Sequence, residues 1–507
     1  MMKNIIEYLR SSKDKYPDKI AFVDEEKSIS FRQLDEEAQK MATLIIDKCG
    51  SIKNNPIAVY IDKSVDSIIS FFGIVYSGNF YVPLDIKSPF VRVKNILETL
   101  NPIAVISKDK KLENFGGWID IDFELHYSYE VVDLTKKTSM TLDIDPLYVL
   151  FTSGSTGKPK GVIISHKSVI DYTEWLSKTF NFNEKTIFGN QAPFYFDNSI
   201  LDIYSTLKHG ATMYIIPEKL FPFSKLLLEY LKENKINTLF WVPSALISVA
   251  NSGVLENTKL DMLENVLFCG EVMPNKQLNI WRNYYPNILY ANLYGPTEIT
   301  DVCTYYIVNR KFDDNESLPI GFPCENSEII VLNENNQPIS NDEHGELCVR
   351  GTCLSYGYYN DNEKTDASFV QNPLNHSYYE KIYRTGDIVK YNEFGELIYI
   401  CRKDYQIKHQ GYRIELGEIE IAVSSIDGVH QNCVIYDDSS SKIILFCTTN
   451  GYIDSKSIYK CMQTKLPKYM LPTKINILPE MPLNVNGKID RLKLKENHIW
   501  NYACKII

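Results

Sequence analysis

The sequence predicts a large N-terminal body of layered α/β structure over residues 1–403 and a small C-terminal α+β unit over residues 404–507. Three observations lead to this fold class. The chain has 507 residues, more than one hydrophobic core usually supports. Apolar runs rich in β-branched residues alternate with helical patterns over most of the length, which is typical of largely parallel sheets. After about residue 404 this alternation stops, and the remaining ~100 residues have an ordinary domain size.

In the large part, residues 57–61 (IAVYI) predict a strand and Val65–Tyr76 predicts the helix that follows it. Residues 80–84 predict the next strand. Further buried strands are expected at residues 236–242 and at Asn265–Phe268.

In the small part, residues 431–436 and 442–448 predict a strand pair joined by residues 437–441. A helix is expected at 458–466, ending before Pro467. Residues 402–413 would connect the two parts and act as a hinge.

The overall composition excludes several classes of protein. The chain is 44% apolar and 23% charged, as globular proteins are, and its net charge of −10 argues against nucleic-acid binding, which needs clustered Lys and Arg. The longest apolar stretch, residues 68–76, is far shorter than the ~20 residues that span a membrane, and the first residues contain no signal-peptide core. Eleven cysteines are scattered without a CxxC pair, which indicates reduced thiols and a cytoplasmic location.

The most specific local pattern is residues 148–162 (YVLFTSGSTGKPKGV), a loop of hydroxyl, glycine and lysine residues between two apolar strands. Glycine allows the backbone to approach an anion closely, and successive N–H groups in such a loop form an anion-binding nest. Lys158 or Lys160 adds positive charge. A flexible surface turn is the alternative, and the loop does not match the Walker A pattern. The sequence therefore predicts a phosphate-binding loop of a different kind.

At these residues the chain resembles the adenylate-forming superfamily, which contains acyl-CoA synthetases, adenylation domains of peptide synthetases and luciferase-like enzymes. Within it, the chain is similar to freestanding amino-acid adenylation enzymes such as D-alanine–carrier protein ligases. The resemblance covers nearly the whole chain and implies the fold of that superfamily. Seven further motifs follow in the family order: 77–85 (SGNFYVPLD), 292–298 (NLYGPTE), 345–351 (GELCVRG), 383–387 (YRTGD), 402–420 (RKDYQIKHQGYRIELGEIE), 466–472 (LPKYMLP) and 486–491 (NGKIDR).

The resemblance implies that the cofactors are ATP and Mg²⁺. Attack of a carboxylate on the α-phosphate brings two anions together, so the site must align both reactants and neutralise charge. By resemblance, Glu298 is a magnesium ligand, Tyr294 stacks on adenine and Asp387 accepts hydrogen bonds from the ribose hydroxyls. The implied nucleotide-binding residues are Thr152, Ser153, Gly154, Ser155, Thr156, Gly157, Lys158, Asn292, Tyr294, Gly295, Thr297, Asp387 and Arg402.

The resemblance also implies a catalytic set of Lys488, Glu298 and Thr152. Lys488 would bridge the substrate carboxylate and the α-phosphate, where a compact cation offsets their repulsion. Asp404 matches the family hinge, about which the small domain rotates between two half-reactions. The loop around Gly411 would then line a tunnel for the acceptor thiol. Cys401 stands where the family has a glycine, which is a departure in the local hinge sequence.

The motif FDNS at residues 196–199 points to an amino-acid substrate. By resemblance, Asp197 pairs with the α-ammonium group, and Phe196 is an aromatic gate beside the carboxylate. Cys269, in LFCGE, is similar to the D-alanine ligases and favours a small D-residue. Asp301 fits less well with a small apolar substrate. Its carboxylate indicates a polar or cationic substrate side chain, or it points away from the pocket. The implied lining is Asn198, Leu201, Phe240, Leu267, Cys269, Leu293, Asp301 and Val302, for which simple core packing is the alternative.

The predicted reaction is ATP-dependent formation of an aminoacyl-adenylate with release of pyrophosphate, followed by transfer to a thiol. No carrier-domain motif follows residue 491, so the expected acceptor is the phosphopantetheine of a separate carrier protein. The alternatives are an acyl- or aryl-acid:CoA ligase, with free coenzyme A as the acceptor, and a non-catalytic relative. Lys488, Glu298 and Asp387 are all present, which favours an enzyme.

Overall fold

The structure is a computed structural model that describes residues 2–108, 112, 117–154, 157–340, 343–404, 406–437, 440–483 and 489–496. It divides into two compact units. The first consists of Met1–Ile86, Thr99–Leu150 and Gly161–Lys403, and the second of Lys87–Glu98, Phe151–Lys160 and Asp404–Ile507. The last change of unit lies between Lys403 and Asp404. The smaller unit thus includes two segments from the N-terminal part of the chain, one of which contains the predicted phosphate loop. The sequence did not indicate that these segments belong to the smaller unit.

The first unit contains a nine-stranded sheet in the order β15-β14-β13-β12-β11-β9-β10-β1-β2. The pairings from β13 through β12, β11, β9 and β10 to β1 are parallel, and the outer pairs at both ends are antiparallel. The strands are β1 (Ile20–Val23), β2 (Ser28–Ser30), β9 (Ile187–Asn190), β10 (Thr212–Ile215), β11 (Thr238–Trp241), β12 (Asn265–Phe268), β13 (Leu289–Tyr294), β14 (Thr304–Ile307) and β15 (Phe322–Pro323).

A second sheet has the order β6-β5-β3-β4-β7-β8. Its pairs β5–β6, β3–β5, β3–β4 and β4–β7 are parallel, which confirms the predicted βαβ arrangement. Strands β7 and β8 bracket the phosphate loop, as the sequence predicted. The strands are β3 (Pro56–Tyr60), β4 (Phe80–Pro83), β5 (Ala104–Ser107), β6 (Ile119–Asp122), β7 (Pro146–Thr152) and β8 (Lys160–Ser165).

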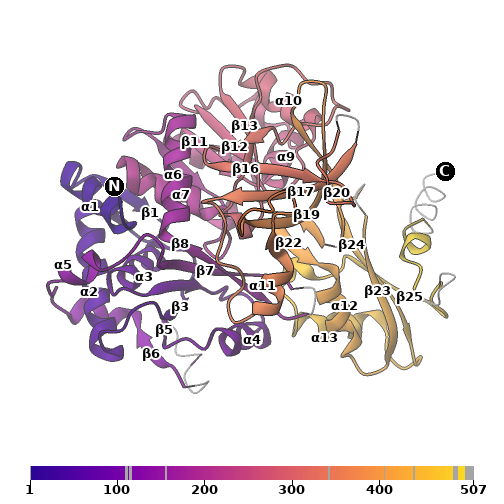
Figure 1. The fold of residues 1–507 in the computed structure, drawn as a ribbon, viewed down its shortest axis with the longest axis horizontal. Coiled ribbons are helices and arrows are strands. Elements are labelled where there is room, and N and C mark those ends of the chain that lie inside the picture. The colour runs from indigo at the N-terminus through magenta and orange to yellow at the C-terminus, as the bar shows by residue number, and fades with distance from the viewer. Residues whose placement is uncertain are drawn as a thin grey trace. The chain divides into compact units, whose positions relative to one another are not determined.

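Helices cover these two sheets, and α2 and α3 lie side by side (Figure 1). Helix α2 begins at a capping box in which the Ser30 and Gln33 side chains bond each other's backbone N–H groups. Helix α3 is buried on every side, which explains its continuous apolar sequence. The helices up to residue 368 are α1 (Ile6–Lys15), α2 (Phe31–Cys49), α3 (Val65–Tyr76), α4 (Phe90–Leu100), α5 (Thr135–Ser139), α6 (His166–Phe180), α7 (Ser199–His209), α8 (Ser224–Glu233), α9 (Pro243–Asn251), α10 (Asn275–Tyr284) and α11 (Asn362–Ser368).

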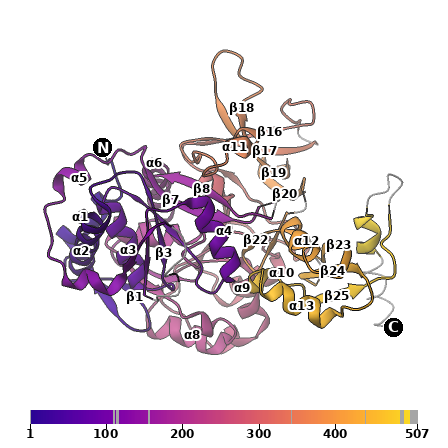
Figure 2. The same ribbon diagram turned by 90° about the horizontal axis from the view of Figure 1, so that it is seen from below.

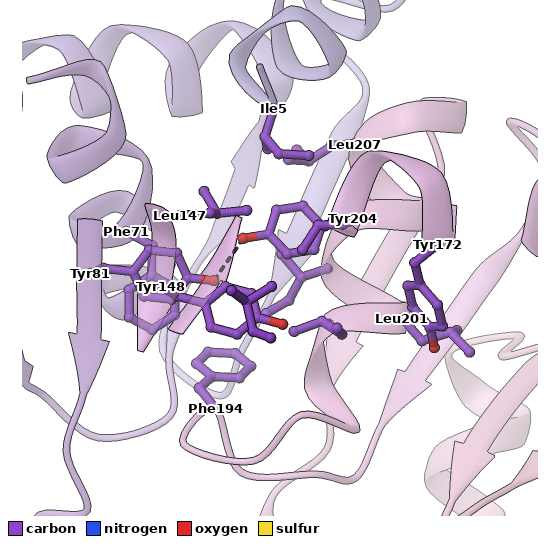
Figure 3. Packing of buried hydrophobic residues seen from close by; sticks show 14 of the residues in the cluster. Ile5, Phe71, Tyr81, Leu147, Tyr148, Tyr172, Phe194, Leu201, Tyr204 and Leu207 are labelled. Carbon is purple, nitrogen blue, oxygen red and sulfur yellow. Dashed lines mark hydrogen bonds between the residues drawn. The ribbon is translucent and has the colours of Figure 1, made fainter. Parts of the chain in front are cut away.

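The largest core cluster joins the second sheet to α7 through aromatic side chains (Figure 3). Tyr81 of β4 and Tyr204 of α7 share a hydrogen bond of 2.6 Å between their hydroxyl groups. Phe71 stacks on Tyr81, with their ring centroids 4.3 Å apart. Tyr148 of β7 is buried beside the same ring. Packing of this kind holds Tyr148 within β7, the strand that precedes the predicted phosphate loop.

A five-stranded antiparallel sheet completes the first unit, and its strands are grouped together in Figure 2. Strand β19 pairs with three of the others, β17, β18 and β20. The sequence reading did not predict this sheet. Its strands are β16 (Ser327–Leu332), β17 (His344–Gly351), β18 (Phe369–Gln371), β19 (Lys381–Tyr391) and β20 (Leu397–Arg402).

The C-terminal part of the second unit has a sheet of β23 (Val429–Asp437), β24 (Lys442–Thr449) and β25 (Lys474–Ile477), with apolar clusters on both faces. The predicted strand pair is confirmed. The unpredicted elements include β25, a hairpin of β21 (Gln406–His409) and β22 (Tyr412–Glu415), and α12 (Leu416–Ser424).

The predicted helix at 458–466 was placed too late, because α13 spans Ser455–Gln463. The Asp454 side chain accepts a hydrogen bond from the Ser457 N–H at 2.8 Å, and this cap starts the helix three residues earlier. Among the described residues, no helix combines the length and hydropathy that crossing a bilayer requires.

Candidate active site

The phosphate loop leaves β7 at Thr152, whose buried hydroxyl has no hydrogen-bond partner in the described part of the chain. The Ser153 hydroxyl donates to the Arg413 carbonyl at 2.8 Å, and the Gly154 N–H donates to Oε2 of Glu418 at 3.3 Å. All of these residues belong to the second unit. The loop therefore carries the donors that an anion site needs, and two of them contact α12 and the strand before it.

Two further features of the loop bear on anion binding. Gly157 has a φ of +78°, which favours glycine, and a Cβ there would be crowded by the Ile421 side chain at 3.0 Å. Lys158 is exposed and Lys160 is buried. Ser155 and Thr156, which the sequence also assigned to the nucleotide, lie outside the described residues.

A second group of predicted residues meets in the first unit, around Asp387. The Tyr294 hydroxyl donates to Oδ2 of Asp387, and Nη1 of Arg402 donates to its Oδ1 at 3.0 Å. Asp387 is 2% exposed. Arg402 also donates to the Thr385 carbonyl at 3.0 Å. Burial and the adjacent Asp387 raise the pKa of Tyr294 well above its usual range, so the phenol stays protonated and donates.

The strand order explains why these residues meet. Asp387 of β19 and Arg402 of β20 are register partners in the five-stranded sheet. Tyr294 ends β13 in the nine-stranded sheet. Tyr294, Asp387 and Arg402 thus come together from two sheets.

The segment after β13 positions the rest of the NLYGPTE motif. The Asn292 side chain donates to the Pro319 carbonyl at 2.8 Å. A Cβ on Gly295 would lie 2.4 Å from the Asp301 backbone oxygen, so only glycine allows the chain to fold back here. Thr297 is buried at the start of a short 3₁₀ helix, η5 (Thr297–Ile299).

Glu298, the predicted magnesium ligand, has an exposed fraction of 0%. Its Oε1 accepts a hydrogen bond from the Tyr358 hydroxyl at 2.8 Å, and its backbone carbonyl accepts from Ser355 at 2.9 Å. No cluster of three or more metal-ligating side chains occurs within the described ranges. An oriented, buried carboxylate fits a Mg²⁺ ion that takes its other ligands from phosphate oxygens and water, as this ion usually does.

The predicted substrate pocket draws on adjacent parallel strands. Phe240 of β11 and Leu267 of β12 are register partners, and Leu293 lies on β13 beside them. Phe196 and Asp197, half-buried, precede α7. The lining residues that the sequence named are all buried: Asn198, Leu201, Phe240, Leu267, Cys269, Leu293, Asp301 and Val302.

Tyr172 is a residue that the sequence analysis missed. It lies on the buried face of α6, and its hydroxyl donates to Oδ2 of Asp301 at 2.6 Å. Asp301 is 1% exposed. Burial, with Asp301 as the next cause and Cys269 among the further ones, raises the pKa of Tyr172 well above its usual range. The Asp301 carboxylate is therefore buried against Tyr172, not turned towards solvent. A tyrosine in an amphipathic helix gives no local signal for such a contact.

The backbone holds Asp301 in an uncommon conformation. Thr300 and Asp301 have φ values of +60° and +75°. Two consecutive non-glycine residues in the left-handed region cost free energy and persist only where the surroundings impose them. The Thr300 hydroxyl donates to the Cys353 carbonyl at 2.8 Å, which anchors this turn.

Three further residues named from the sequence, Lys488, Asp404 and Gly411, belong to the second unit. Lys488 lies outside the described residues. The Asp404 side chain accepts from the Gln406 N–H at 3.1 Å. Gly411 (φ +81°) and Gln410 (φ +52°) form the tight turn between β21 and β22. Cys401, in the first unit, lies in β20 at a register shift against β19, and its φ is not positive, so the backbone there does not require the glycine that the family motif has.

The chain matches known proteins along almost its entire length. The model of the family described as AMP-binding enzyme matches residues 9–359. A D-alanine–D-alanyl carrier protein ligase of Bacillus licheniformis is 31% identical, over 97% of this chain and 99% of that protein. Zwittermicin A synthase ZmaJ of Bacillus cereus is 30% identical, over 94% and 91% of the two chains.

A solved structure shares the fold: the Vibrio cholerae adenylation domain AlmE in complex with glycyl-adenosine-5'-phosphate. It has a TM-score of 0.82 and 21% sequence identity, and the match covers 98% of each chain. These findings define an AMP-forming ligase of the adenylate-forming superfamily. The chain belongs to the AMP-binding enzyme family, and the predicted family and fold class are confirmed.

Proposed function

We propose that this protein uses ATP to convert an amino acid into an aminoacyl-adenylate, releasing pyrophosphate, and then transfers the aminoacyl group to the phosphopantetheine thiol of a separate carrier protein. The observation that carries the proposal is the similarity, over nearly the whole of both chains, to a ligase named for D-alanine and its carrier protein. The buried carboxylate, phenol and guanidinium around Asp387 support it independently.

The Asp387 cluster is suited to hold the nucleoside. A carboxylate offers about four lone-pair positions. Tyr294 and Arg402 each bond a different oxygen of Asp387, which fixes the orientation of the group. Each oxygen keeps a lone pair for one ribose hydroxyl. The Tyr294 ring would lie against adenine, and the Thr152 hydroxyl and the amides of the loop would bind the phosphates.

Glu298 is our proposed protein ligand for Mg²⁺. The ion would neutralise charge on the phosphates as pyrophosphate leaves. The Tyr358 hydroxyl orients the carboxylate, since it donates to one of its two oxygens at 2.8 Å. Supporting groups of this kind commonly tune a ligand's geometry.

Asp197 is our proposed partner of the substrate's α-ammonium group, with Phe196 as the gate beside the carboxylate. In Asp197→Ala the ammonium would lose its charged partner, so we expect a rise in KM for the amino acid of tenfold or more and little change in KM for ATP. Initial rates of amino-acid-dependent ATP–pyrophosphate exchange measure both constants. An unchanged KM for the amino acid would remove Asp197 from the pocket.

Two lining residues point to different substrate side chains. Cys269 favours a small, D-alanine-like residue. Asp301, buried and oriented by Tyr172, favours a side chain with a hydrogen-bond donor or a positive charge, because such a group is the natural complement of a carboxylate. Large neighbours such as Phe240 and Leu293 favour a short one. A short side chain that ends in an amine or a hydroxyl satisfies all of these residues.

An exchange panel tests this substrate class. We expect serine or 2,3-diaminopropionate, in one stereoisomer, to outperform D-alanine. Asp301→Asn should reduce that preference about tenfold, and Tyr172→Phe should reduce it less, because it removes only the hydrogen bond that orients the acid. A preference for D-alanine that neither variant changes would contradict the role of Asp301. No exchange with any D- or L-amino acid would contradict the proposed function.

The acceptor is tested by mass spectrometry of products formed with phosphopantetheinylated carrier proteins and with coenzyme A. Mass added to a carrier supports the proposal, and exclusive formation of acyl-CoA would contradict it. We also propose a cytoplasmic location, where ATP is available and thiols stay reduced. All ten cysteines in the described ranges are free.

A further inference from the structure

The phosphate loop already contacts an anionic side chain. The backbone N–H of Gly154 donates to Oε2 of Glu418, a residue of α12, at 3.3 Å. Glu418 is 3% exposed, and both residues lie in the second unit. A carboxylate is the kind of group that a loop of backbone amides binds.

Arg92 holds Glu418 in this position. The guanidinium of Arg92, on α4, forms an ion pair with Oε1, the other oxygen of Glu418. Arg92 is 8% exposed, so both charges are largely removed from water. Burial raises the pKa of Glu418, while Arg92 and the Gly154 N–H act in the opposite direction. Such a pair keeps a fixed geometry, because either charge alone would be costly to bury.

Two further contacts in the same unit reinforce this arrangement. The Ser153 hydroxyl donates to the Arg413 carbonyl at 2.8 Å. Ile421, one turn after Glu418 on α12, packs against Gly157, where a Cβ would lie 3.0 Å from its side chain. An amide, a hydroxyl and a glycine of the loop are thus all engaged by residues 413–421.

We propose that Glu418 is an internal competitor of the nucleotide. Its carboxylate accepts the hydrogen bond of the Gly154 N–H group. The β- or γ-phosphate of ATP would accept the same hydrogen bond when it binds to the loop. One N–H group cannot donate fully to both acceptors, so polyphosphate must displace Glu418 when it binds. This inference rests on the proposed function only in taking the loop to be the phosphate site.

The competition lowers the apparent affinity for polyphosphate. If the Glu418 contact is populated nine-tenths of the time, the apparent Kd is about tenfold weaker than that of the open loop. We expect adenosine and its α-phosphate to bind without the Gly154 amide. The contact should therefore discriminate ATP and tripolyphosphate from AMP.

Glu418→Gln tests the proposal, because it removes the charge and keeps the shape. Titration calorimetry of the full-length protein should show MgATP and magnesium tripolyphosphate binding about five- to tenfold more tightly, with AMP unchanged. Arg92→Lys keeps a positive charge but loses the planar fork, so it should give a smaller change in the same direction. Glu98→Gln, which removes an exposed charge on α4, is the matched control and should change nothing.

The possible results are distinct. Unchanged or weaker binding of tripolyphosphate in both Glu418→Gln and Arg92→Lys, with normal melting temperatures, would overturn the competition. Tighter binding of AMP to the same extent would also overturn it, because the effect would not belong to the β- and γ-phosphates. If the wild-type protein catalyses ATP–pyrophosphate exchange but the variants bind tripolyphosphate with wild-type affinity, only this inference fails. If the wild type catalyses no exchange, the proposed function itself fails.

Discussion

At the scale of single residues, Asp387 is a buried carboxylate whose hydrogen bonds suit it to its proposed role in binding the nucleotide. Its carboxylate is almost inaccessible and receives hydrogen bonds from a phenol on one oxygen and a guanidinium on the other. An ionised group in such a place is stable only while these partners remain. The same contacts would orient it in advance for the proposed nucleotide, which would lower the entropy cost of binding.

Asp387→Asn should therefore weaken nucleotide binding more than it alters the fold. Hydrogen bonds to charged groups contribute about 1.5–3 kcal/mol, so we expect KM for ATP in the exchange assay to rise at least tenfold. The melting temperature should fall by a few degrees, because Arg402 loses its charged partner. Asp133→Asn, an exposed control, should change neither quantity. An unchanged KM for ATP would separate this cluster from the nucleotide.

At the scale of elements, the turn after β13 depends on one glycine. The chain returns so closely that the Asp301 carbonyl lies 2.4 Å from where a Cβ of residue 295 would be. The left-handed conformations of Thr300 and Asp301 belong to the same turn. This element presents both Glu298 and Asp301, so its shape controls two parts of the candidate site.

Gly295→Ala should displace the turn. The new methyl group cannot be accommodated next to backbone atoms, so we expect a loss of melting temperature of several degrees and a large loss of exchange activity. Gly117→Ala is the control, because no atom of the described residues lies within 4 Å of the added Cβ there. Wild-type melting and activity in Gly295→Ala would contradict the close approach.

A buried histidine, His166, lies at the start of α6 and contributes to the packing of this helix. Nδ1 of His166 accepts a hydrogen bond from the Ile5 N–H at 3.3 Å, which links α6 to α1. Burial lowers the pKa of His166 from 6.5 to about 3. The folded protein therefore keeps this ring neutral while the unfolded chain takes up a proton below about pH 6.5.

This difference makes stability fall as the pH falls from about 6.5 towards 3. At pH 5 the folded state should be less stable by about 2 kcal/mol from His166 alone. His166→Gln removes the titration, so its melting temperature should drop less than that of the wild type between pH 7 and pH 5. Calorimetric melts of both proteins, with exposed His344→Gln as the control, measure the difference. Equal drops in all three would show that His166 does not titrate in this range.

At the scale of the whole molecule, the proposed chemistry needs both compact units. The first unit contains Asp387, Tyr294 and Glu298, and the second contains the phosphate loop and, in the sequence, Lys488. A protein that divides the groups for one reaction between two units can couple their movement to the order of its steps. This is the physical basis of the predicted rotation about Asp404.

Lys488→Ala should separate the two half-reactions. Removing a cation at the reacting phosphate should slow ATP–pyrophosphate exchange at least 100-fold. Transfer to the carrier from supplied aminoacyl-adenylate should keep most of its rate, since that step makes no new bond to phosphate. Exposed Lys493→Ala is the control. An equal loss in both steps would contradict a role for Lys488 in adenylation alone.

The sequence by itself determined what local patterns encode. Periodicity identified the strand–helix–strand order around Val65–Tyr76 and the strand pair near residue 437. The glycine-rich order of residues 152–158 predicted a phosphate-binding loop. The ordered motifs determined the family. Each of these signals lies within a few dozen residues, where side-chain spacing reports directly on which face is buried.

Only the tertiary structure decided which residues meet. The Tyr172 hydroxyl on Asp301, the Tyr294 hydroxyl on Asp387 and the Arg92–Glu418 pair join positions 129, 93 and 326 residues apart. No local pattern specifies such partners, because strand order and helix packing bring them together. The antiparallel sheet around β19 was missed for the same reason. Elements follow from short-range sequence, whereas the orientation of buried charges follows from the packing of distant segments.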